Sequence, residues 1–341
     1  MGKMKVRLQC EAGAKSKSTV YVVRGQQESL LGRVDCEKLG IITIKREGES
    51  GPADPVKKLA VVKLEMQEAE NQAQLQVKMT SMLDQYPQLF QGIGQAKLAP
   101  VHIHIKEGVP PVTQKLRPVP VSMMEPLKAK LDMYVKEGVI EGPLGADQAT
   151  GWVHNVVLTG KKWDPKAIRL NLDTRMMKKA VVPAQYPIPT PEQLRHKFLG
   201  SNRYSIVDLN DAFHQFPLDE ESKELFKFTT PFGIYKYHRL VMGPHPASGE
   251  CQSKMAEILR GLEVVTQIKD DIVVHGRDDQ HDDRLRAVLD RLTQFNITLR
   301  RDKCFLGQKS VKWFGHIFSE QGMSPDPEKV ENIKAWPEPT L

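Results

Sequence analysis

Two strand-like segments that carry acidic residues constrain the fold of this chain more than any other feature. Residues 204–209 form an apolar run that is rich in β-favouring side chains and contains Asp208. Farther along, apolar runs flank Asp270 and Asp271, as in a β-hairpin with a polar turn. Apolar residues at helical spacing predict a helix at about 247–262, between the two segments. The order of strand, helix, hairpin and helix predicts an α+β fold in which helices cover one face of an antiparallel sheet.

The acidic residues of these segments suggest a metal site. If the strands are neighbours, Asp208, Asp270 and Asp271 meet at one edge of the sheet. Clustered carboxylates repel one another unless a cation neutralises them. Mg²⁺ typically uses one or two carboxylates together with substrate phosphates, and a pair of such ions can support phosphoryl transfer. An Asp-Asp pair in a turn is also ordinary turn chemistry with solvated charge, so the pair alone leaves both interpretations open.

The positive charge of the chain is concentrated in one stretch. The 341 residues include 49 Lys and Arg against 42 Asp and Glu, which gives a net charge of +7. Residues 161–179 contain seven cationic and two acidic side chains, a balance of +5. Such a stretch is either the solvated face of a hairpin or a surface that binds phosphate groups. Charge counting leaves both alternatives open.

Length and composition exclude several classes of protein. At about 100–200 residues per domain, the chain can hold two domains and part of a third. Its 40% of apolar residues can build a core, which excludes a wholly disordered chain. No apolar run reaches the ~18 residues that a membrane span needs. Four widely spaced cysteines argue against a disulfide scaffold or a zinc site and fit a reducing compartment.

The pattern along the chain predicts three regions. Residues 1–45 are predicted to be β-rich, and 46–83 to be a charged, Gly- and Pro-containing linker and lead-in. From about residue 100 the hydrophobic periodicity becomes stronger. Four further elements are predicted there: a strand at 101–105, a helix that begins with a capping box of Ser122 and Glu125, a helix that begins at Thr190, and an amphipathic helix at 285–295.

Residues 84–341 resemble the reverse transcriptase domain of long-terminal-repeat retrotransposons of the gypsy class. The resemblance is carried by a series of motifs in the family's order. These motifs are Lys-Leu-Arg-Pro-Val-Pro at 115–120, Gly-Val-Ile-Glu at 138–141, Arg-Leu-Asn-Leu-Asp-Thr-Arg at 169–175, Tyr-Pro-Ile-Pro at 186–189, Tyr-Ser-Ile-Val-Asp-Leu-Asn-Asp-Ala-Phe-His-Gln at 204–215, Thr-Pro-Phe-Gly at 230–233, Ile-Lys-Asp-Asp at 268–271 and Val-Lys-Trp-Phe-Gly-His at 311–316. Their number and order are much more specific than any single motif.

The resemblance implies a right-hand polymerase core with fingers, a palm built on an antiparallel sheet, and the start of a thumb. The implied activity is RNA-directed DNA polymerase, which adds deoxynucleotides to a primer 3′ end by two-metal phosphoryl transfer. The implied cofactor is Mg²⁺, as two ions. The implied partners are an RNA or DNA template–primer duplex and deoxynucleoside triphosphates, with no membrane. We expect an intracellular location, in the cytoplasm or in a virus-like particle.

The resemblance also assigns roles to seven residues. The three that match the metal-binding carboxylates are Asp208, Asp270 and Asp271. The four that match nucleotide-binding residues are Lys162 and Arg169, which would hold the triphosphate, Gln252, which would lie beside the nucleotide, and Phe213, which would exclude a 2′-hydroxyl. Without the family, Phe213 is more simply a core aromatic and Gln252 an ordinary polar residue on a helix.

Several positions depart from the family pattern and support an alternative function. Ile268 stands where the family usually has an aromatic residue, and the charged Lys269 stands where it has an apolar one. An expected Pro-Phe-Gly is Val-Met-Gly at 241–243. The thumb is expected to be only partly present, with ribonuclease H and integrase regions beyond it. The alternatives are a catalytically inactive nucleic-acid-binding retroelement remnant, or an inert fragment that folds poorly.

The N-terminal region resembles a second kind of protein. Residues 29–33, Ser-Leu-Leu-Gly-Arg, and the short helix predicted after them resemble the C-terminal end of a retropepsin-like aspartic protease. Residues 1–45 are therefore interpreted as a remnant of such a protease. That enzyme needs an Asp-Ser/Thr-Gly triplet, which is absent from the sequence. We expect no proteolytic activity.

One further cluster of acidic and histidine side chains was weighed as a metal site. Its members are Asp278, Asp279, His281, Asp282 and Asp283. Acidic residues suit the first turn of a helix, so a solvated loop and helix start is the preferred interpretation. His275 is likewise predicted to be a surface residue at a strand end.

Overall fold

The computed structural model describes residues 2–9, 15–22, 71–72, 74–161, 164–183, 186–187, 189–243, 246–262, 265–268 and 270–336. The chain divides into two compact units, Met1–Ser81 and Met82–Leu341. In the first unit, β1 (Gly2–Gln9) pairs antiparallel with β2 (Lys15–Val22). The protease-like motif at 29–33, the helix predicted after it and the linker at 46–58 lie outside the described residues.

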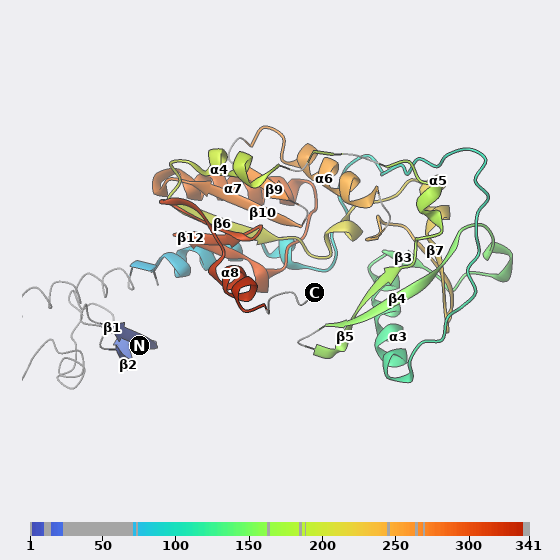
Figure 1. Cartoon of the computed structure of the whole chain (residues 1–341), viewed down its shortest axis with the longest axis horizontal. Helices are drawn as coiled ribbons and strands as arrows, with labels where there is room; N and C mark the ends of the chain where they lie inside the picture. Colours follow the sequence, from blue (N-terminus) through green and yellow to red (C-terminus); the bar gives the residue numbers. More distant parts are fainter. Residues whose placement is uncertain are drawn as a thin grey trace, which may run out of the picture. The chain divides into compact units, whose positions relative to one another are not determined.

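In the second unit, one lobe is built on a five-stranded sheet (Figure 1). The strands, in their order across the sheet, are β3 (Ile140–Glu141), β8 (Gly233–Tyr237), β7 (Lys227–Thr230), β4 (Val153–Lys161) and β5 (Asp164–Leu172). The pairing of β4 with β7 is parallel, and the other pairings are antiparallel. Helix α3 (Val121–Lys136) packs against this sheet and buries Leu127, Leu131 and Tyr134. The predicted helix is confirmed, but its predicted capping box is wrong, because α3 begins after Pro120 without a side-chain cap.

The second lobe is built on a four-stranded antiparallel sheet. Its strands, in order, are β11 (Phe305–Gln308), β6 (Arg203–Asp208), β10 (Asp271–Gly276) and β9 (Val265–Ile268). Strand β6 and the hairpin β9–β10 are the two segments predicted to be neighbours, and the structure pairs β6 directly with β10. The predicted antiparallel sheet is therefore confirmed, and both lobes together give the expected mixture of helices and sheets.

The two faces of the four-stranded sheet are covered differently. Helix α7 (Asp278–Gln294) packs against β10 and β6, and buries the predicted apolar stripe from Leu285 to Leu292. Alternate β6 residues, Tyr204 and Ile206, instead join a core with α4 (Pro191–Phe198) and a small sheet. This sheet consists of β12 (Ser310–Trp313), β13 (His316–Ser319) and β14 (Gly322–Pro325). The expectation of helices on one face is therefore incomplete, because a helix and a second sheet cover the other face.

The remaining described elements are short. They include α5 (Glu220–Lys223), α6 (Ala247–Ile258), α8 (Pro327–Lys334), and the 3₁₀ turns η1 (Pro87–Phe90), η2 (Ala146–Gln148), η3 (Met177–Lys179), η4 (Ala212–Gln215), η5 (Glu224–Phe226) and η6 (Arg301–Lys303). Residues 74–84, ahead of η1, are also helical. Helix α4 begins at the predicted position with a capping box of Thr190 and Gln193. The strand predicted at 101–105 forms only isolated bridges, at Val101 and Ile105. Among the described residues, no helix is long and apolar enough to cross a membrane.

Candidate active site

The predicted acidic residues lie at the end of the β6–β10 ladder. Asp208 ends β6 and stands directly opposite Asp271, the first residue of β10. Residues that are directly opposite in an antiparallel ladder have side chains on the same face of the sheet. Asp270 occupies the turn before β10, where its carbonyl oxygen accepts a hydrogen bond from the Leu209 backbone N–H at 3.1 Å. The pairing of β6 with β10 thus brings carboxylates from two separate segments together.

Partial burial makes ionisation of these carboxylates unfavourable. Burial is the main cause that raises the pKa of Asp208, and the opposing charge of Lys303 is the main cause that lowers it. The Lys303 ammonium lies 3.4 Å from Oδ2 of Asp208. The pKa of Asp271 is also raised, first by burial and then by the neighbouring charge of Asp208. A cation placed beside this pair would favour the ionised form of both groups.

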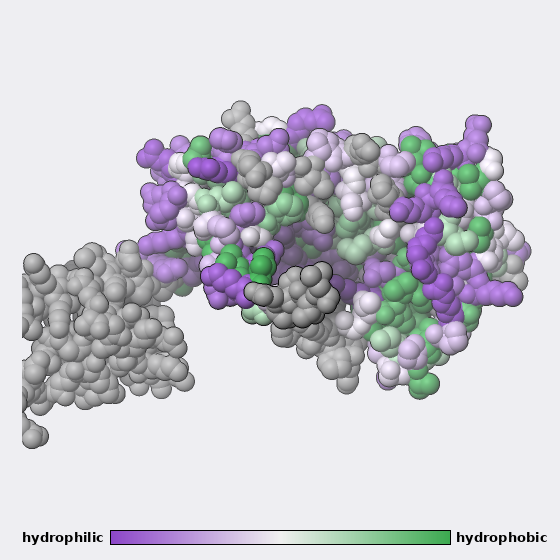
Figure 2. All heavy atoms as spheres, in the orientation of Figure 1, coloured by the Kyte–Doolittle hydropathy of each residue, from purple (hydrophilic) through white to green (hydrophobic). Residues whose placement is uncertain are grey.

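Four of the seven predicted residues line one cleft, which lies between the two lobes. Asp208 and Asp270 come from the four-stranded sheet, Arg169 comes from β5, and Phe213 comes from η4. Further residues that line this cleft include Lys130, Tyr134, Asp211, Met242, Arg300 and Lys303. In the space-filling view, the surface is hollowed between the lobes, and hydrophilic side chains gather in the visible part of the hollow (Figure 2). The cleft therefore combines carboxylates, cations and a buried aromatic ring.

The other three predicted residues are placed differently. Asp271 does not line the cleft, and its carboxylate is hydrogen-bonded to the Trp313 side chain. Gln252, on α6, lines a different pocket, and its amide donates to the side-chain oxygen of Gln267 at 2.7 Å. Its predicted place beside the nucleotide stays a prediction. Lys162 lies outside the described residues.

Several residues of the cleft are not predicted from the sequence, and Met242, Arg300 and Lys303 are examples. Met242 belongs to the Val-Met-Gly segment that departs from the family pattern, but the pattern assigns no role to it. Arg300 and Lys303 follow α7 by several residues, and their approach to Asp208 depends on a tertiary contact. The Arg300 backbone N–H donates to the Asp208 carbonyl oxygen at 2.9 Å, which fixes this segment against β6. No local pattern marks that contact.

The donor set was tested against the Mg²⁺ ions that the resemblance implies. Across the described part of the chain, no three His, Cys, Asp or Glu side chains come together as ligands for one ion. Mg²⁺ needs only one or two carboxylates when substrate phosphates complete its coordination. Asp208 and Asp270 supply carboxylates to one cleft, and Arg169 supplies a cation for phosphate there. The residues therefore fit an ion that is held jointly by protein and substrate.

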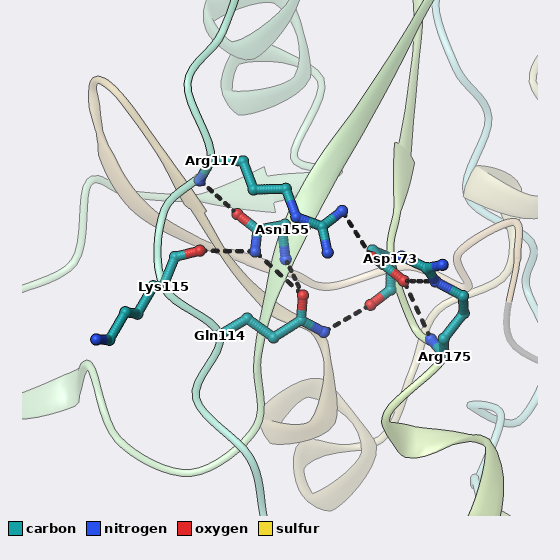
Figure 3. Close-up of polar contacts among 6 residues, drawn as sticks. All are labelled: Gln114, Lys115, Arg117, Asn155, Asp173 and Arg175. Atoms are coloured by element: carbon teal, nitrogen blue, oxygen red, sulfur yellow. Dashed lines mark hydrogen bonds and ion pairs between the residues drawn. The ribbon is translucent and has the colours of Figure 1, made fainter.

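A second polar cluster lies on the lobe that carries Arg169 (Figure 3). Its centre is Asp173, whose side chain is 4% exposed and accepts two hydrogen bonds from Arg175, both at 2.7 Å. Arg117, from a distant part of the sequence, contacts the same carboxylate at 2.9 Å. The hydrogen bonds from Arg175 are the main reason that the pKa of Asp173 is lowered. Within the basic stretch 161–179, the exposed guanidinium of Arg175 is thus held in place by a buried acid, which also contacts Arg117.

The neighbouring segment is held by amide hydrogen bonds. The Asn155 side chain donates to the Lys115 carbonyl oxygen at 2.8 Å and to Oε1 of Gln114 at 3.1 Å. The Gln114 side chain in turn donates to the Asp173 carbonyl oxygen at 2.9 Å. These contacts fix the extended chain that carries Arg117 against β4 and β5 (Figure 3).

Two histidines predicted to be exposed are buried. His275 is 2% exposed, and its ring nitrogen lies 3.0 Å from the Ser201 hydroxyl. His281 is fully buried, and its Nε2 lies 2.9 Å from the Ser205 hydroxyl. The prediction of a solvated surface is wrong for both residues, because α7 packs its first turns directly onto β6 and β10.

Comparisons with known proteins give the family of the central segment. Residues 160–318 match the family model described as reverse transcriptase (RNA-dependent DNA polymerase). The uncharacterized protein K02A2.6 of Caenorhabditis elegans is 30% identical over 259 residues, which cover 75% of this chain and 20% of that protein. The retrovirus-related Pol polyprotein from transposon 412 of Drosophila melanogaster is 27% identical over 244 residues, which cover 70% of this chain and 19% of that protein. The chain thus spans about a fifth of the length of these relatives.

Solved structures show the same fold. A foamy viral protease-reverse transcriptase in complex with dsDNA has a TM-score of 0.68 and 20% identity, over 77% of this chain and 54% of that one. The foamy viral protease-reverse transcriptase in complex with an RNA/DNA hybrid has a TM-score of 0.65 and 18% identity, over 99% of this chain and 44% of that one. The expected polymerase-like arrangement is therefore confirmed. Together, the matched segment and the retrotransposon relatives support a reverse transcriptase domain of the long-terminal-repeat retrotransposon kind in this chain.

Proposed function

We propose that this chain is the polymerase part of a gypsy-class retrotransposon polyprotein. Its reaction is RNA-directed DNA synthesis, in which a primer 3′-hydroxyl attacks the α-phosphate of a deoxynucleoside triphosphate and pyrophosphate leaves. One observation carries the proposal: Asp208, Asp270, Arg169 and Phe213, which come from separate elements, line one cleft. Packing of a hydrophobic core alone would not require these four residues to line the same cleft.

Each residue of the cleft has a distinct task in this proposal. The exposed guanidinium of Arg169 binds the triphosphate, because its planar fork matches two phosphate oxygens. The ring of Phe213 packs below the sugar and leaves no room for a 2′-hydroxyl. Asp208 and Asp270 would hold two Mg²⁺ ions, with Asp271 in support. When bound, these ions stabilise charge on the attacking and leaving oxygens.

The partners of the proposed reaction are a template–primer duplex and deoxynucleotides. Foamy viral enzymes of this fold have been solved with dsDNA and with an RNA/DNA hybrid, which supports a duplex as the partner. Arg117 and Arg175, with side chains 55% and 77% exposed, are available to template phosphates. Asp173 keeps both arginines ordered, so less side-chain entropy is lost when a phosphate binds. We assign residues 84–341 to this polymerase region and expect no proteolytic activity from the rest.

A primer-extension assay with Mg²⁺ tests the proposal. We expect the wild-type chain to extend a DNA primer on an RNA template, and Asp270→Asn to abolish extension while the protein stays folded and binds the duplex. Asp283→Asn, which removes an exposed acid on α7 outside the cleft, is the matched control and should leave extension unchanged. Extension that survives Asp270→Asn would show that the carboxylates of the cleft are not the catalytic groups.

A second candidate is a nucleic-acid-binding remnant without catalysis. Met242 lines the cleft at a position where the sequence departs from the family pattern, and Gln252 lies outside it. Duplex binding by the wild-type chain without any extension, over a range of Mg²⁺ concentrations, would favour this candidate.

A further inference from the structure

The turn that carries Phe213 has little support of its own. It consists of η4, a single 3₁₀ turn of four residues. Asp211, which precedes η4, has a φ of 45°, a left-handed conformation that is unfavourable for a residue with a Cβ. Within the turn, the backbone N–H of His214 donates to the Asp211 carbonyl oxygen, and the backbone N–H of Phe216 donates to the Phe213 carbonyl oxygen. Short 3₁₀ segments have poor hydrogen-bond geometry, so contacts from outside must hold this one.

The side chain of Gln215 supplies the first of these contacts. It is fully buried, and its amide nitrogen donates to the carbonyl oxygens of Asn210 at 2.7 Å and of Thr298 at 2.8 Å. Its amide oxygen accepts from the Thr298 backbone N–H at 2.7 Å. A single planar amide therefore ties the start and the end of the turn to the segment that follows α7. The direction of each bond is fixed, because donors and acceptor share one plane.

Arg239 supplies the second contact from the other side. Its guanidinium is 4% exposed and donates to the His214 carbonyl oxygen at 3.2 Å and to the Gly94 carbonyl oxygen at 2.9 Å. It also donates to the carbonyl oxygens of Glu137 and Gly138, where α3 ends. A buried charge is costly unless it is hydrogen-bonded, and the end of a helix offers partial negative charge. Arg239 thus joins the turn, α3 and the chain at Gly94.

A tight backbone crossing links the two side chains. Residues 92–96, here called the strap, run between Gln215 and Arg239. The Gly94 N–H donates to the Thr298 hydroxyl at 2.9 Å, and the Ala96 N–H donates to the Gln215 carbonyl oxygen at 2.7 Å. A Cβ on Gly94 would lie 2.3 Å from the Asn296 carbonyl oxygen, so no side chain fits there. The strap is therefore closely packed at Gly94 against the Gln215 side chain and the segment after α7.

We propose that Gln215 and Arg239 are positioning residues that set the nucleotide selectivity of the cleft. They touch neither the carboxylates nor the cleft opening, and they act through the turn that carries Phe213. The inference rests on the proposed polymerase function. If the turn is held rigidly, the ring of Phe213 keeps a fixed distance from the sugar and rejects ribonucleotides. If either side chain loses its bonds, the ring moves away and ribonucleotides enter.

The test compares selectivity rather than activity alone. Gln215→Met keeps an unbranched side chain of similar length and removes all three amide bonds. We expect the ratio of kcat/KM for a deoxynucleotide to that for its ribonucleotide to fall at least about tenfold, since displacements near 1 Å cost up to about a hundredfold in well-positioned sites. Ser201→Ala, which loses a buried hydrogen bond to His275 far from the cleft, is the control and should leave the ratio unchanged.

A second pair of variants guards against misfolding of the first. Thr298→Val removes the hydroxyl that binds the strap but keeps the side-chain shape, and Thr298→Ser keeps the hydroxyl. We expect the valine variant to lose selectivity and the serine variant to retain it. A role in stability alone would lower the rates with both nucleotides equally and leave the ratio unchanged in every variant, which would overturn the proposal.

Amide hydrogen exchange separates this inference from the proposed function. In Gln215→Met we expect the amides of His214 and Phe216 to exchange at least tenfold faster than in the wild type, while the amides of α7 keep their rates. If the wild type does not extend primers but this local change occurs, the polymerase assignment fails and the positioning of the turn stands. Equal exchange at these amides in both proteins would refute the positioning role.

Discussion

Acid should destabilise this protein through the buried imidazole of His275. The side chain is 2% exposed and packs on the Phe198 ring at a centroid distance of 4.4 Å. Burial is the main cause that lowers the pKa of His275 to about 4, and the charges of Arg284 and Lys197 add to it. In an unfolded chain, the pKa of histidine is about 6.5. The contribution of His275 to the free energy of unfolding is therefore fully present above about pH 6.5. It is lost as the pH falls toward 4, because the unfolded state then binds a proton that the folded state does not.

The size of this effect follows from the two pKa values. Between pH 7.5 and pH 5.0, a group with a pKa of about 6.5 unfolded and about 4 folded costs about 2 kcal/mol of stability. His275→Gln keeps a side chain that can bond the Ser201 hydroxyl but does not titrate. We expect the free energy of unfolding, measured in urea, to fall between pH 7.5 and pH 5.0 in both proteins. The fall in the wild type should exceed the fall in His275→Gln by about 2 kcal/mol.

The control for this experiment is a histidine at the surface. His104→Gln, which removes an exposed histidine and leaves His275 in place, is the matched control for the substitution itself. Other buried histidines, such as His214, remain in all three proteins and cancel in the comparison. If His275→Gln loses as much stability as the wild type between pH 7.5 and pH 5.0, burial does not keep this imidazole neutral and the reasoning is refuted.

Three further predictions concern the strap, the exposed arginines and the cleft. Gly94→Ala should lower the free energy of unfolding by about 1–3 kcal/mol, because the added Cβ has no room. The control is Gly160→Ala, where a Cβ meets nothing within 4 Å and the free energy of unfolding should not fall; calorimetry or urea unfolding measures both variants. Changing Arg117 and Arg175 together to Ala should reduce the slope of log K against log salt for template binding by about 1.4–1.8, and an unchanged slope would show that neither binds phosphate. Phe213→Val should raise ribonucleotide incorporation in primer extension at nearly unchanged deoxynucleotide use, and equal selectivity would remove the ring from its proposed role.

Local sequence patterns predicted the parts of this fold that depend on nearest neighbours. Apolar runs of β-favouring residues predicted β6 and the β9–β10 hairpin, and antiparallel pairing then sets Asp208 against Asp271. Apolar runs and turn residues are local properties, so they can be recognised without tertiary information. The resemblance added Arg169 and Phe213, which come from other elements and which the structure places in the same cleft. No periodicity could have linked these residues to the carboxylates.

What the sequence did not predict depends on packing between distant segments. Lys303 approaches Asp208 because its backbone neighbour Arg300 is bonded to β6, and that contact spans about ninety residues. Gln252 is assigned to the nucleotide by motif, and its amide also pairs with Gln267 on β9, a contact that the motif does not predict. In each case, a polar side chain found its partner through the tertiary fold, and the residue type alone was compatible with several partners.

The burial of His281 depends on a polar contact that the apolar run of β6 does not indicate. Ser205 lies within the apolar run of β6, yet its hydroxyl oxygen accepts from the Gly307 N–H at 2.9 Å. The register of β11 against β6 shifts at this point, so the serine side chain takes the place of a ladder carbonyl. Oδ1 of Asp282 lies 3.2 Å from Nδ1 of His281, and because an ionised carboxylate can only accept, this contact favours the proton on Nδ1 and leaves Nε2 of the neutral ring to accept from the Ser205 hydroxyl. One serine thus contacts both a histidine on α7 and the edge strand β11, and the apolar run that predicts β6 indicates neither contact.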